Sequence, residues 1–197
     1  MTGSVGTGKS TVARMFRRLG AAQLDADALA HEVIEPDRPA WRELVSAFGS
    51  GVLTRGRRVS RPRLARIVFA SPTSRRRVER IIHPRVLREL QRRLAALRRR
   101  GRVRAAVVEI PLLFESGAER LVDVVVVVVA PPAVQRRRLR RHGWSLQEIE
   151  ARRKAQWKLS AKVALAGEVI DNAHGVEATR TQVKRIWNRL GLERRRK

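Results

Sequence analysis

The chain has 197 residues, with 44 lysines and arginines against 18 aspartates and glutamates, so its formal net charge at pH 7 is +26. It contains no cysteine, which excludes disulfide bonds and thiolate metal sites. It also lacks an apolar run of about 18 residues and a signal-peptide pattern, which argues against a helical membrane span. The length suits one domain, and we expect a cytoplasmic protein with no membrane partner.

The excess of positive charge would suit a polyanionic partner, either nucleic acid or a phosphorylated small molecule. The arginines, however, are spread over every predicted helix rather than gathered on one of them. Aromatic residues make up only 4% of the chain and tyrosine is absent, so few side chains could stack on single-stranded bases. We therefore expect an arginine-rich solvated surface and no specific nucleic-acid partner, and the oligomeric state is left open.

The spacing of apolar residues predicts the first elements in chain order. Val12, Phe16 and Leu19 recur at helical intervals, and Gly20 ends that helix. A short apolar run follows and leads to Asp25. The predicted elements here are a helix over 10–19, a strand over 21–24, a helix that ends before Pro36, a helix over 39–48 and a loop over 49–60.

The rest of the chain combines helical spacing with two strongly apolar runs. The pair His83-Pro84 is predicted to interrupt a helix, because proline has no N–H to donate. The valines of 122–129, with no polar alternation, are typical of a strand covered on both faces. The remaining predicted elements are helices over 62–69 and 72–82, a long helix ending near Gly101, strands over 103–110, 122–129 and 169–171, a helix opened by a capping box of Ser145 and Glu148, and a last helix ending near Leu190. Alternating strands and helices of this kind predict an α/β fold with a parallel sheet core and flanking helices.

Residues 3–10, Gly-Ser-Val-Gly-Thr-Gly-Lys-Ser, satisfy the phosphate-loop pattern G-x-x-x-x-G-K-[ST] at every specified position. The glycines allow successive backbone N–H groups to turn inward, and the helix that follows adds the positive end of its dipole. Lys9 can reach the β and γ phosphates of a nucleoside triphosphate, and the Ser10 hydroxyl can ligate Mg²⁺. The pattern therefore predicts a phosphate loop that binds a triphosphate.

One feature of this loop is unusual. A phosphate loop should follow a β-strand from the middle of the sheet, and here only Met1 and Thr2 precede it. We expect that the first core strand is missing from this chain because the reading frame was started at a methionine inside the motif. Loss of its ladder hydrogen bonds would cost roughly several kcal/mol.

Further motifs narrow the class of protein. The D-x-x-G and N-K-x-D signals of GTPases are absent, which favours a small kinase. The informative motifs are Thr2-Gly3, Gly8-Lys9-Ser10-Thr11, Asp25-Ala26-Asp27, Glu35-Pro36, His83-Pro84, Pro111-Leu112-Leu113-Phe114-Glu115, Gln156 and Val169-Ile170-Asp171-Asn172. In their order and spacing, these motifs resemble those of the dephospho-CoA kinase family. The resemblance implies a P-loop kinase fold and transfer of a phosphoryl group from ATP, with Mg²⁺, to the 3′-hydroxyl of dephospho-CoA.

The same resemblance implies roles for individual residues. Asp27 would accept the proton of the ribose hydroxyl, although Asp25 or Asp27 could instead cap the next helix. Arg137 and Arg141 would be lid arginines, with Arg152 a further candidate, unless they belong to a solvated face. The candidates are Asp27, Lys9 and Arg141 for catalysis; Gly3, Gly6, Thr7, Gly8, Lys9, Ser10, Thr11, Arg137 and Asn172 for ATP; Asp27, His83, Pro84, Leu112 and Glu115 for the acceptor; and Ser10 for the metal. Glu109 could touch Mg²⁺ through water or pair with an arginine, and we expect the arginine pair.

The expected organisation is one kinase domain over 1–197. Its core would comprise 1–30, 103–130 and 167–190, with a helical acceptor-binding insertion over about 31–100, a lid over about 136–160 and a disordered tail at 194–197. Two alternatives stay open at this point. One is another small-molecule or nucleotide kinase of the P-loop class, and the other is a basic nucleic-acid-binding protein.

Overall fold

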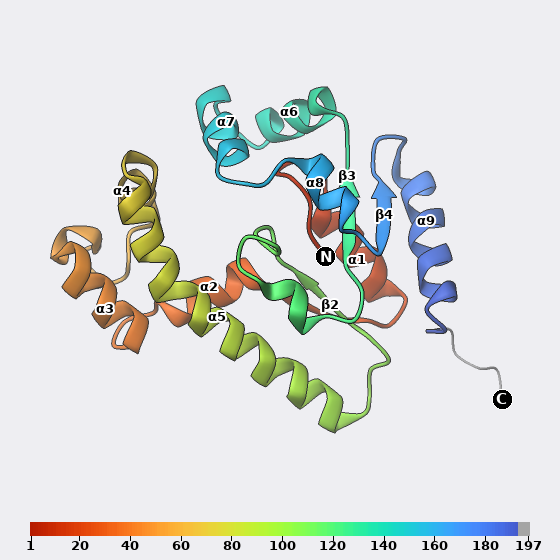
Figure 1. Ribbon diagram of the computed structural model, residues 1–197, viewed down its shortest axis with the longest axis horizontal. Helices are drawn as coiled ribbons and strands as arrows, with labels where there is room; N and C mark the ends of the chain where they lie inside the picture. The colour runs from red at the N-terminus through yellow and green to blue at the C-terminus, as the bar shows by residue number, and fades with distance from the viewer. Residues whose placement is uncertain (193–197) are drawn as a thin grey trace. The chain divides into compact units, whose positions relative to one another are not determined.

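The computed structural model describes residues 1–192, apart from the side chain of Phe69, and the predicted tail at 194–197 lies outside them. The chain divides into two compact units (Figure 1). The first combines Met1–Asp25 with the chain from Leu94 onward, and the second is Ala26–Arg93. Within residues 1–192, no helix is both long and apolar enough to cross a membrane.

The first unit contains all the strands. Its elements are α1 (Lys9–Arg18), β1 (Ala22–Asp25), β2 (Ala106–Glu109), a 3-10 turn (Ala118–Leu121), β3 (Val126–Val129), α6 (Pro132–Arg141), α7 (Leu146–Lys154), α8 (Leu159–Ala164), β4 (Glu168–Asp171) and α9 (Val176–Arg189). The second unit is helical. Its elements are α2 (Ala26–Val33), α3 (Pro39–Phe48), a 3-10 turn (Ser50–Val52), α4 (Arg61–Ala70) and most of α5 (Pro72–Arg100).

The sheet consists of two parallel pairs, β1 with β2 and β3 with β4. Met1 and Thr2 lie between β2 and β3 and join the pairs, so the order across the sheet is β1, β2, residues 1–2, β3, β4. Their main-chain hydrogen bonds run from Met1 N to Val108 O at 2.7 Å, from Ile110 N to Met1 O at 2.9 Å, from Thr2 N to Val126 O at 2.9 Å and from Val128 N to Thr2 O at 2.9 Å. The two residues therefore hold the central place expected for the strand before the phosphate loop, although they form a bridge and not a full strand.

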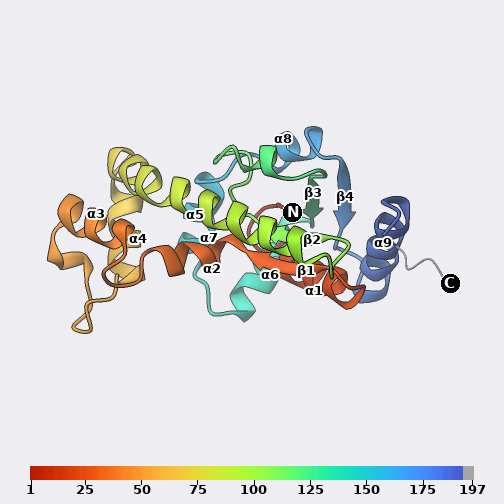
Figure 2. The same cartoon turned by 90° about the horizontal axis from the view of Figure 1, so that it is seen from below.

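The core of the first unit lies on one face of the sheet, under α1 and α9. Phe16 and Trp187 meet across the two helices, with ring centroids 6.5 Å apart. Figure 1 shows α9 beside β4, and Figure 2 shows α1 along β1 and β2, in agreement with the contacts between these elements. The buried members of the core are Met1, Val12, Ala13, Met15, Phe16, Ala21, Val126, Val128, Ile170, Val183, Ile186 and Trp187. Each large apolar side chain buried here stabilises the fold by roughly 1.5–3 kcal/mol.

Two strand predictions were too long. The apolar run over 122–129 forms a strand only at Val126–Val129, and the run over 103–110 forms one only at Ala106–Glu109. An apolar run without clear alternation has no periodicity that marks where the strand begins. The short helix α8, which contacts β3, was not predicted. The capping box is confirmed: Ser145 accepts a hydrogen bond from Glu148 N, and Glu148 accepts one from Ser145 N.

The predicted break at His83-Pro84 is wrong, because α5 continues through Pro84 as a single helix. Val78, Ile81 and Val86 are buried on both sides of the proline, so packing favours the continuous helix. The Arg85 guanidinium also donates to the carbonyl oxygen of Ile81 at 2.6 Å. Arg85 thus supplies a side-chain donor to a helix carbonyl near Pro84, which has no N–H to donate.

Candidate functional site

The phosphate loop begins directly after Thr2, at the edge where the parallel strands end. In register, Asp25 at the end of β1 lies opposite Glu109 at the end of β2, and Val129 lies opposite Asp171. In open α/β sheets this carboxyl-terminal edge is where ligands bind. The helix α1 starts at Lys9, so its first N–H groups and the positive end of its dipole face the same loop.

Two glycines of the loop are required by both conformation and space. Gly3 has φ +146°, and a Cβ there would lie 2.3 Å from the carbonyl oxygen of Val128. Gly8 has φ +90°, and its Cβ would lie 2.2 Å from the side-chain nitrogen of Asn172. Real Cβ atoms do not approach other atoms so closely, and both φ values lie in the region that favours glycine. The loop can therefore fit against the sheet only with these glycines.

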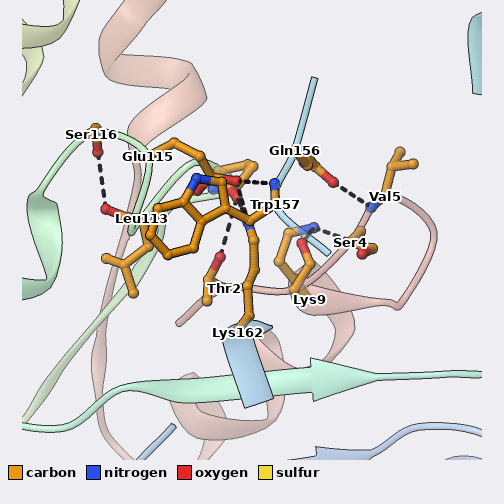
Figure 3. Close-up of polar contacts among 12 residues, drawn as sticks. Thr2, Ser4, Val5, Lys9, Leu113, Glu115, Ser116, Gln156, Trp157 and Lys162 are labelled. Carbon is orange, nitrogen blue, oxygen red and sulfur yellow. Dashed lines mark hydrogen bonds and ion pairs between the residues drawn. The ribbon is translucent and has the colours of Figure 1, made fainter. Parts of the chain in front are cut away.

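The Lys9 ammonium lies inside the loop. Its Nζ donates to the carbonyl oxygens of Gly3 and Ser4, each at 3.0 Å (Figure 3). Main-chain acceptors of this kind hold a flexible lysine side chain in place beside the loop N–H groups. An incoming phosphate oxygen can take over this ammonium because its negative charge makes a stronger hydrogen bond. Ser10 is exposed in the first turn of α1, so its hydroxyl is accessible.

A buried network ties the middle of the loop to the end of β4. Asn172 donates from its side-chain nitrogen to the carbonyl oxygen of Thr7 at 2.8 Å. The Thr179 hydroxyl, on α9, donates to the Asn172 side-chain oxygen at 2.9 Å. All three residues are buried. Asn172, predicted as an ATP-binding residue, thus lies against the phosphate loop, and Thr179 is a member of the network that the sequence did not indicate.

Arg138, on α6, contacts the middle of the loop. Its guanidinium donates to the carbonyl oxygens of Thr7 at 3.2 Å and Asn172 at 2.7 Å. Burial lowers the pKa of Arg138, and the neighbouring charge of Arg137 lowers it further. Sequence reasoning did not select Arg138, although one signal was available. On a helix Arg138 lies three residues after Gln135 and so shares a face with this buried residue of α6.

The predicted lid arginines lie on another part of the α6 surface. Arg137 and Arg141 line a hollow of about 690 Å³. Its other lining residues are Arg136, Arg140 and Leu146. Such a concentration of guanidinium groups suits an anionic ligand. Arg152, the further lid candidate, lies over the ring of Trp144 with its guanidinium carbon 4.4 Å from the centroid.

The predicted acceptor residue Glu115 takes part in a second polar cluster near the loop, built around the buried Lys162 (Figure 3). Its Oε1 accepts hydrogen bonds from Lys162 Nζ and from Trp157 N, each at 2.8 Å. Next to Trp157, the Gln156 side-chain oxygen accepts a hydrogen bond from Val5 N at 3.3 Å. Leu112, the other acceptor candidate of this segment, is half-buried. Sequence reasoning missed Lys162, because nothing in its local pattern marks a fully buried lysine.

The expected pairing of Glu109 with an arginine is wrong. Within residues 1–192, Glu109 is 5% exposed and accepts a hydrogen bond from Gln23 Nε2 at 2.8 Å. Gln23 lies on β1, beside the strand that carries Glu109. A buried carboxylate on a sheet edge is satisfied by the nearest donor on the adjacent strand, whereas arginines are concentrated on the helices.

Three predicted residues belong to the second unit. Asp27 lies in the first turn of α2, exposed and two residues beyond the end of β1. His83 and Pro84 lie within α5. His83 is half-buried, and burial lowers its pKa, an effect that the charge of Glu79 opposes. The predicted ATP-binding residues therefore lie in the first unit, together with the acceptor candidates Leu112 and Glu115. The other predicted residues, Asp27, His83 and Pro84, lie in the second unit.

Comparison with known proteins gives a consistent result. The family model of dephospho-CoA kinase matches residues 1–178. A dephospho-CoA kinase of Moorella thermoacetica is 44% identical over 191 residues, which is 96% of this chain and 90% of that protein. One of Symbiobacterium thermophilum is 44% identical over 95% of this chain and 78% of that protein.

Solved structures agree with the sequence matches. The crystal structure of TT1252 from Thermus thermophilus superimposes with a TM-score of 0.82 at 35% identity, covering 96% of this chain and 95% of that one. The dephospho-CoA kinase from Campylobacter jejuni superimposes with a TM-score of 0.70 at 26% identity, covering 96% and 94%. The predicted parallel α/β fold is confirmed by these neighbours and by the strand pairing.

Proposed function

Because the chain belongs to the dephospho-CoA kinase family, and so uses ATP to phosphorylate dephospho-CoA to coenzyme A, we propose that the loop Gly3–Thr11 binds the phosphates of ATP and that Asp27 is the catalytic base. This family membership removes both alternatives left open by the sequence, another small-molecule or nucleotide kinase of the P-loop class and a basic nucleic-acid-binding protein, as the main function. The remaining questions concern which residues perform the reaction.

The position of the Lys9 ammonium carries the proposal for ATP. It lies 3.0 Å from two carbonyl oxygens of its own loop, beside the N-terminus of α1. A triphosphate placed in the loop would meet backbone N–H groups, the helix dipole and this ammonium together. We assign Gly3, Gly6, Thr7, Gly8, Lys9, Ser10 and Thr11 to this phosphate site.

Mg²⁺ fits the same site through Ser10. Within residues 1–192, no group of three or more His, Asp or Glu side chains is arranged to hold a metal ion. Mg²⁺ does not need such a cage, since it keeps several waters and commonly takes one protein ligand together with substrate phosphates. The exposed Ser10 hydroxyl at the loop suits that role. When bound, the ion would neutralise charge on the β and γ phosphates.

Phosphoryl transfer requires a base that takes the proton of the acceptor hydroxyl and cations that stabilise the transferring phosphoryl group. The 3′-oxygen of dephospho-CoA forms a bond to the γ-phosphorus, the bond from this phosphorus to the β–γ bridging oxygen breaks, and ADP leaves. Asp27 takes the hydroxyl proton. Arg141 stabilises the transferring phosphoryl group and Arg137 binds ATP with Asn172, because guanidinium groups match phosphate oxygens in pairs. The resemblance supports His83, Pro84, Leu112 and Glu115 as acceptor contacts.

Two substitutions test these assignments separately. Lys9→Ala should abolish both ATP binding and coenzyme A formation, whereas Asp27→Asn should leave ATP binding intact and lower kcat by roughly 10²–10⁴-fold. Asp123→Asn, an exposed carboxylate on the first unit, is the matched control. ATP binding is measured by calorimetry, and turnover by ADP release coupled to dephospho-CoA. An Asp27→Asn enzyme with a kcat within about threefold of the control would remove Asp27 as the base.

The family supports a site of action. We assign the enzyme to the cytoplasm, without a membrane or nucleic-acid partner, on the basis of its membership of the dephospho-CoA kinase family. Fractionation of cells that produce the full chain, with activity measured in the soluble and membrane fractions, tests this location.

A further inference from the structure

Lys162 is a fully buried cation for which the reaction described above has no use. It lies on α8 with 0% of its side chain exposed. Its ammonium contacts Glu115 Oε1 and the carbonyl oxygen of Pro111, each at 2.8 Å. Burying an unpaired ammonium costs several kcal/mol, and an apolar residue in its place often leaves stability unchanged or higher. Stability alone therefore gives little reason for a lysine at this position.

The two acceptors of Lys162 both lead to the phosphate loop (Figure 3). The Pro111 carbonyl oxygen also accepts a hydrogen bond from the Thr2 hydroxyl, at 3.2 Å. Thr2 is fully buried and directly precedes Gly3, the first residue of the loop. The Lys162 ammonium and the Thr2 hydroxyl therefore donate to the same carbonyl oxygen, and Thr2 is the last residue before the loop.

The second route starts at the carboxylate. Glu115 Oε1 also accepts from Trp157 N at 2.8 Å, which orients the peptide that links Trp157 to Gln156. The Gln156 side chain accepts from Val5 N at 3.3 Å, within the loop itself. Stacking of the Phe114 and Trp157 rings, with centroids 5.9 Å apart, braces the same junction. Glu115 Oε2 is buried and has no hydrogen-bond partner within residues 1–192, so the carboxylate depends on Lys162 for compensation.

We infer that Lys162, paired with Glu115, is a positioning residue for ATP binding, which holds the phosphate loop at Thr2 and Val5. The inference rests on the assignment of ATP to Gly3–Thr11. One ammonium connects the segment 111–115, to which the Thr2 hydroxyl and Trp157 N also donate, with α8. Without it, Pro111 and Glu115 lose their shared donor, and the contacts of the Thr2 hydroxyl with Pro111 and of Val5 with Gln156 are weakened, while the sheet hydrogen bonds of Thr2 remain. The loop then becomes mobile before ATP binds, and the free energy needed to order it on binding lowers the affinity for ATP.

The test compares Lys162→Met with Lys158→Met, which removes an exposed lysine four residues earlier. Lys162→Met should bind ATP roughly 10-fold or more weakly than the control, as expected for loss of charge-assisted hydrogen bonds. Hydrogen exchange should quicken in a peptide covering residues 1–10 and stay unchanged in α9. Loss of stability throughout the unit would quicken both.

A double variant keeps the test decisive if Lys162→Met does not fold. Lys162→Met with Glu115→Gln buries no unpaired charge, and the glutamine oxygen can still accept from Trp157 N. It should fold, and it should show the same weakened ATP binding and faster loop exchange. ATP affinity within about twofold of Lys158→Met, with unchanged loop exchange, would overturn the inference. Failure of the ATP site itself would appear separately, as ATP binding that survives in Lys9→Ala.

Discussion

The Asn172 side-chain nitrogen lies 2.8 Å from the carbonyl oxygen of Thr7, which joins the end of the last strand to the middle of the phosphate loop across 165 residues of sequence. The direction of the amide follows from its neighbours. A reversed amide would place two oxygens against each other at Thr7, so the nitrogen must face this carbonyl. Asn172 therefore supports the loop as a hydrogen-bond donor to the Thr7 carbonyl oxygen.

Gly8→Ala should remove ATP binding. The new Cβ would meet the Asn172 nitrogen at 2.2 Å and would sit at φ +90°, so the loop and the Asn172 side chain must separate. Gly20→Ala is the matched control, because φ is +110° there but nothing lies within 4 Å of a Cβ. Both variants should lose roughly 1 kcal/mol or more of unfolding free energy through backbone strain. Only Gly8→Ala should lose ATP affinity in calorimetry, and equal affinities would contradict this role of Asn172.

Thr179→Val should weaken ATP binding and lower the free energy of unfolding by roughly 1–3 kcal/mol. Valine keeps the shape of threonine but leaves the buried Asn172 oxygen without its donor. Thr179→Ser retains the hydroxyl and should restore most of the affinity. Thr181→Val, an exposed position on the same helix, should behave as the unaltered protein. Urea unfolding and ATP titration of all three variants decide the matter, and a serine variant no better than valine would argue against the hydrogen bond.

Arg138→Lys should fail to replace arginine. The guanidinium reaches the carbonyls of Thr7 and Asn172 with two nitrogens, whereas a single ammonium lacks that fork. We expect Arg138→Lys and Arg138→Met to show similar losses of ATP affinity, of roughly 10-fold or more. Arg180→Met, which removes an exposed arginine paired with Glu177, is the control for lost charge. Full affinity in the lysine variant would show that charge alone suffices.

His83 should make stability depend on pH. Burial lowers its pKa below 6.5 in the folded chain, so the unfolded chain binds the proton more readily. The contribution of His83 to the free energy of unfolding is then fully present above pH 6.5 and is lost as the pH drops from there through the lower pKa of the folded state. Burial also lowers the pKa of the Met1 ammonium from 8.0 to about 5, which adds a decline that both histidine variants keep. His83→Gln should flatten the decline due to His83 in unfolding experiments between about pH 8 and about pH 5, whereas the exposed His142→Gln should not. Parallel curves for the two variants would contradict the prediction.

Features made by neighbours in the chain were predictable from the sequence. The capping box at Ser145 needs only a side chain that reaches three residues along, and the phosphate-loop pattern needs only eight consecutive residues. The parallel sheet followed from apolar runs that alternate with helices. The helix break predicted at Pro84 was wrong. The free energy that a proline costs inside a helix is smaller than the free energy gained by burying Val78, Ile81 and Val86 around it.

Residue types at fixed spacings were enough to predict the α/β class, the phosphate loop and the family. The folded structure was needed to show that Arg138 contacts Thr7 of the loop, that Thr179 bonds to Asn172, and that Lys162 is buried against Glu115. It also placed Met1 and Thr2 between β2 and β3. Most of these relationships join residues far apart in the chain, and burial selects the partners. A buried polar group must bond to whatever donor or acceptor the fold brings to it, which no local pattern specifies.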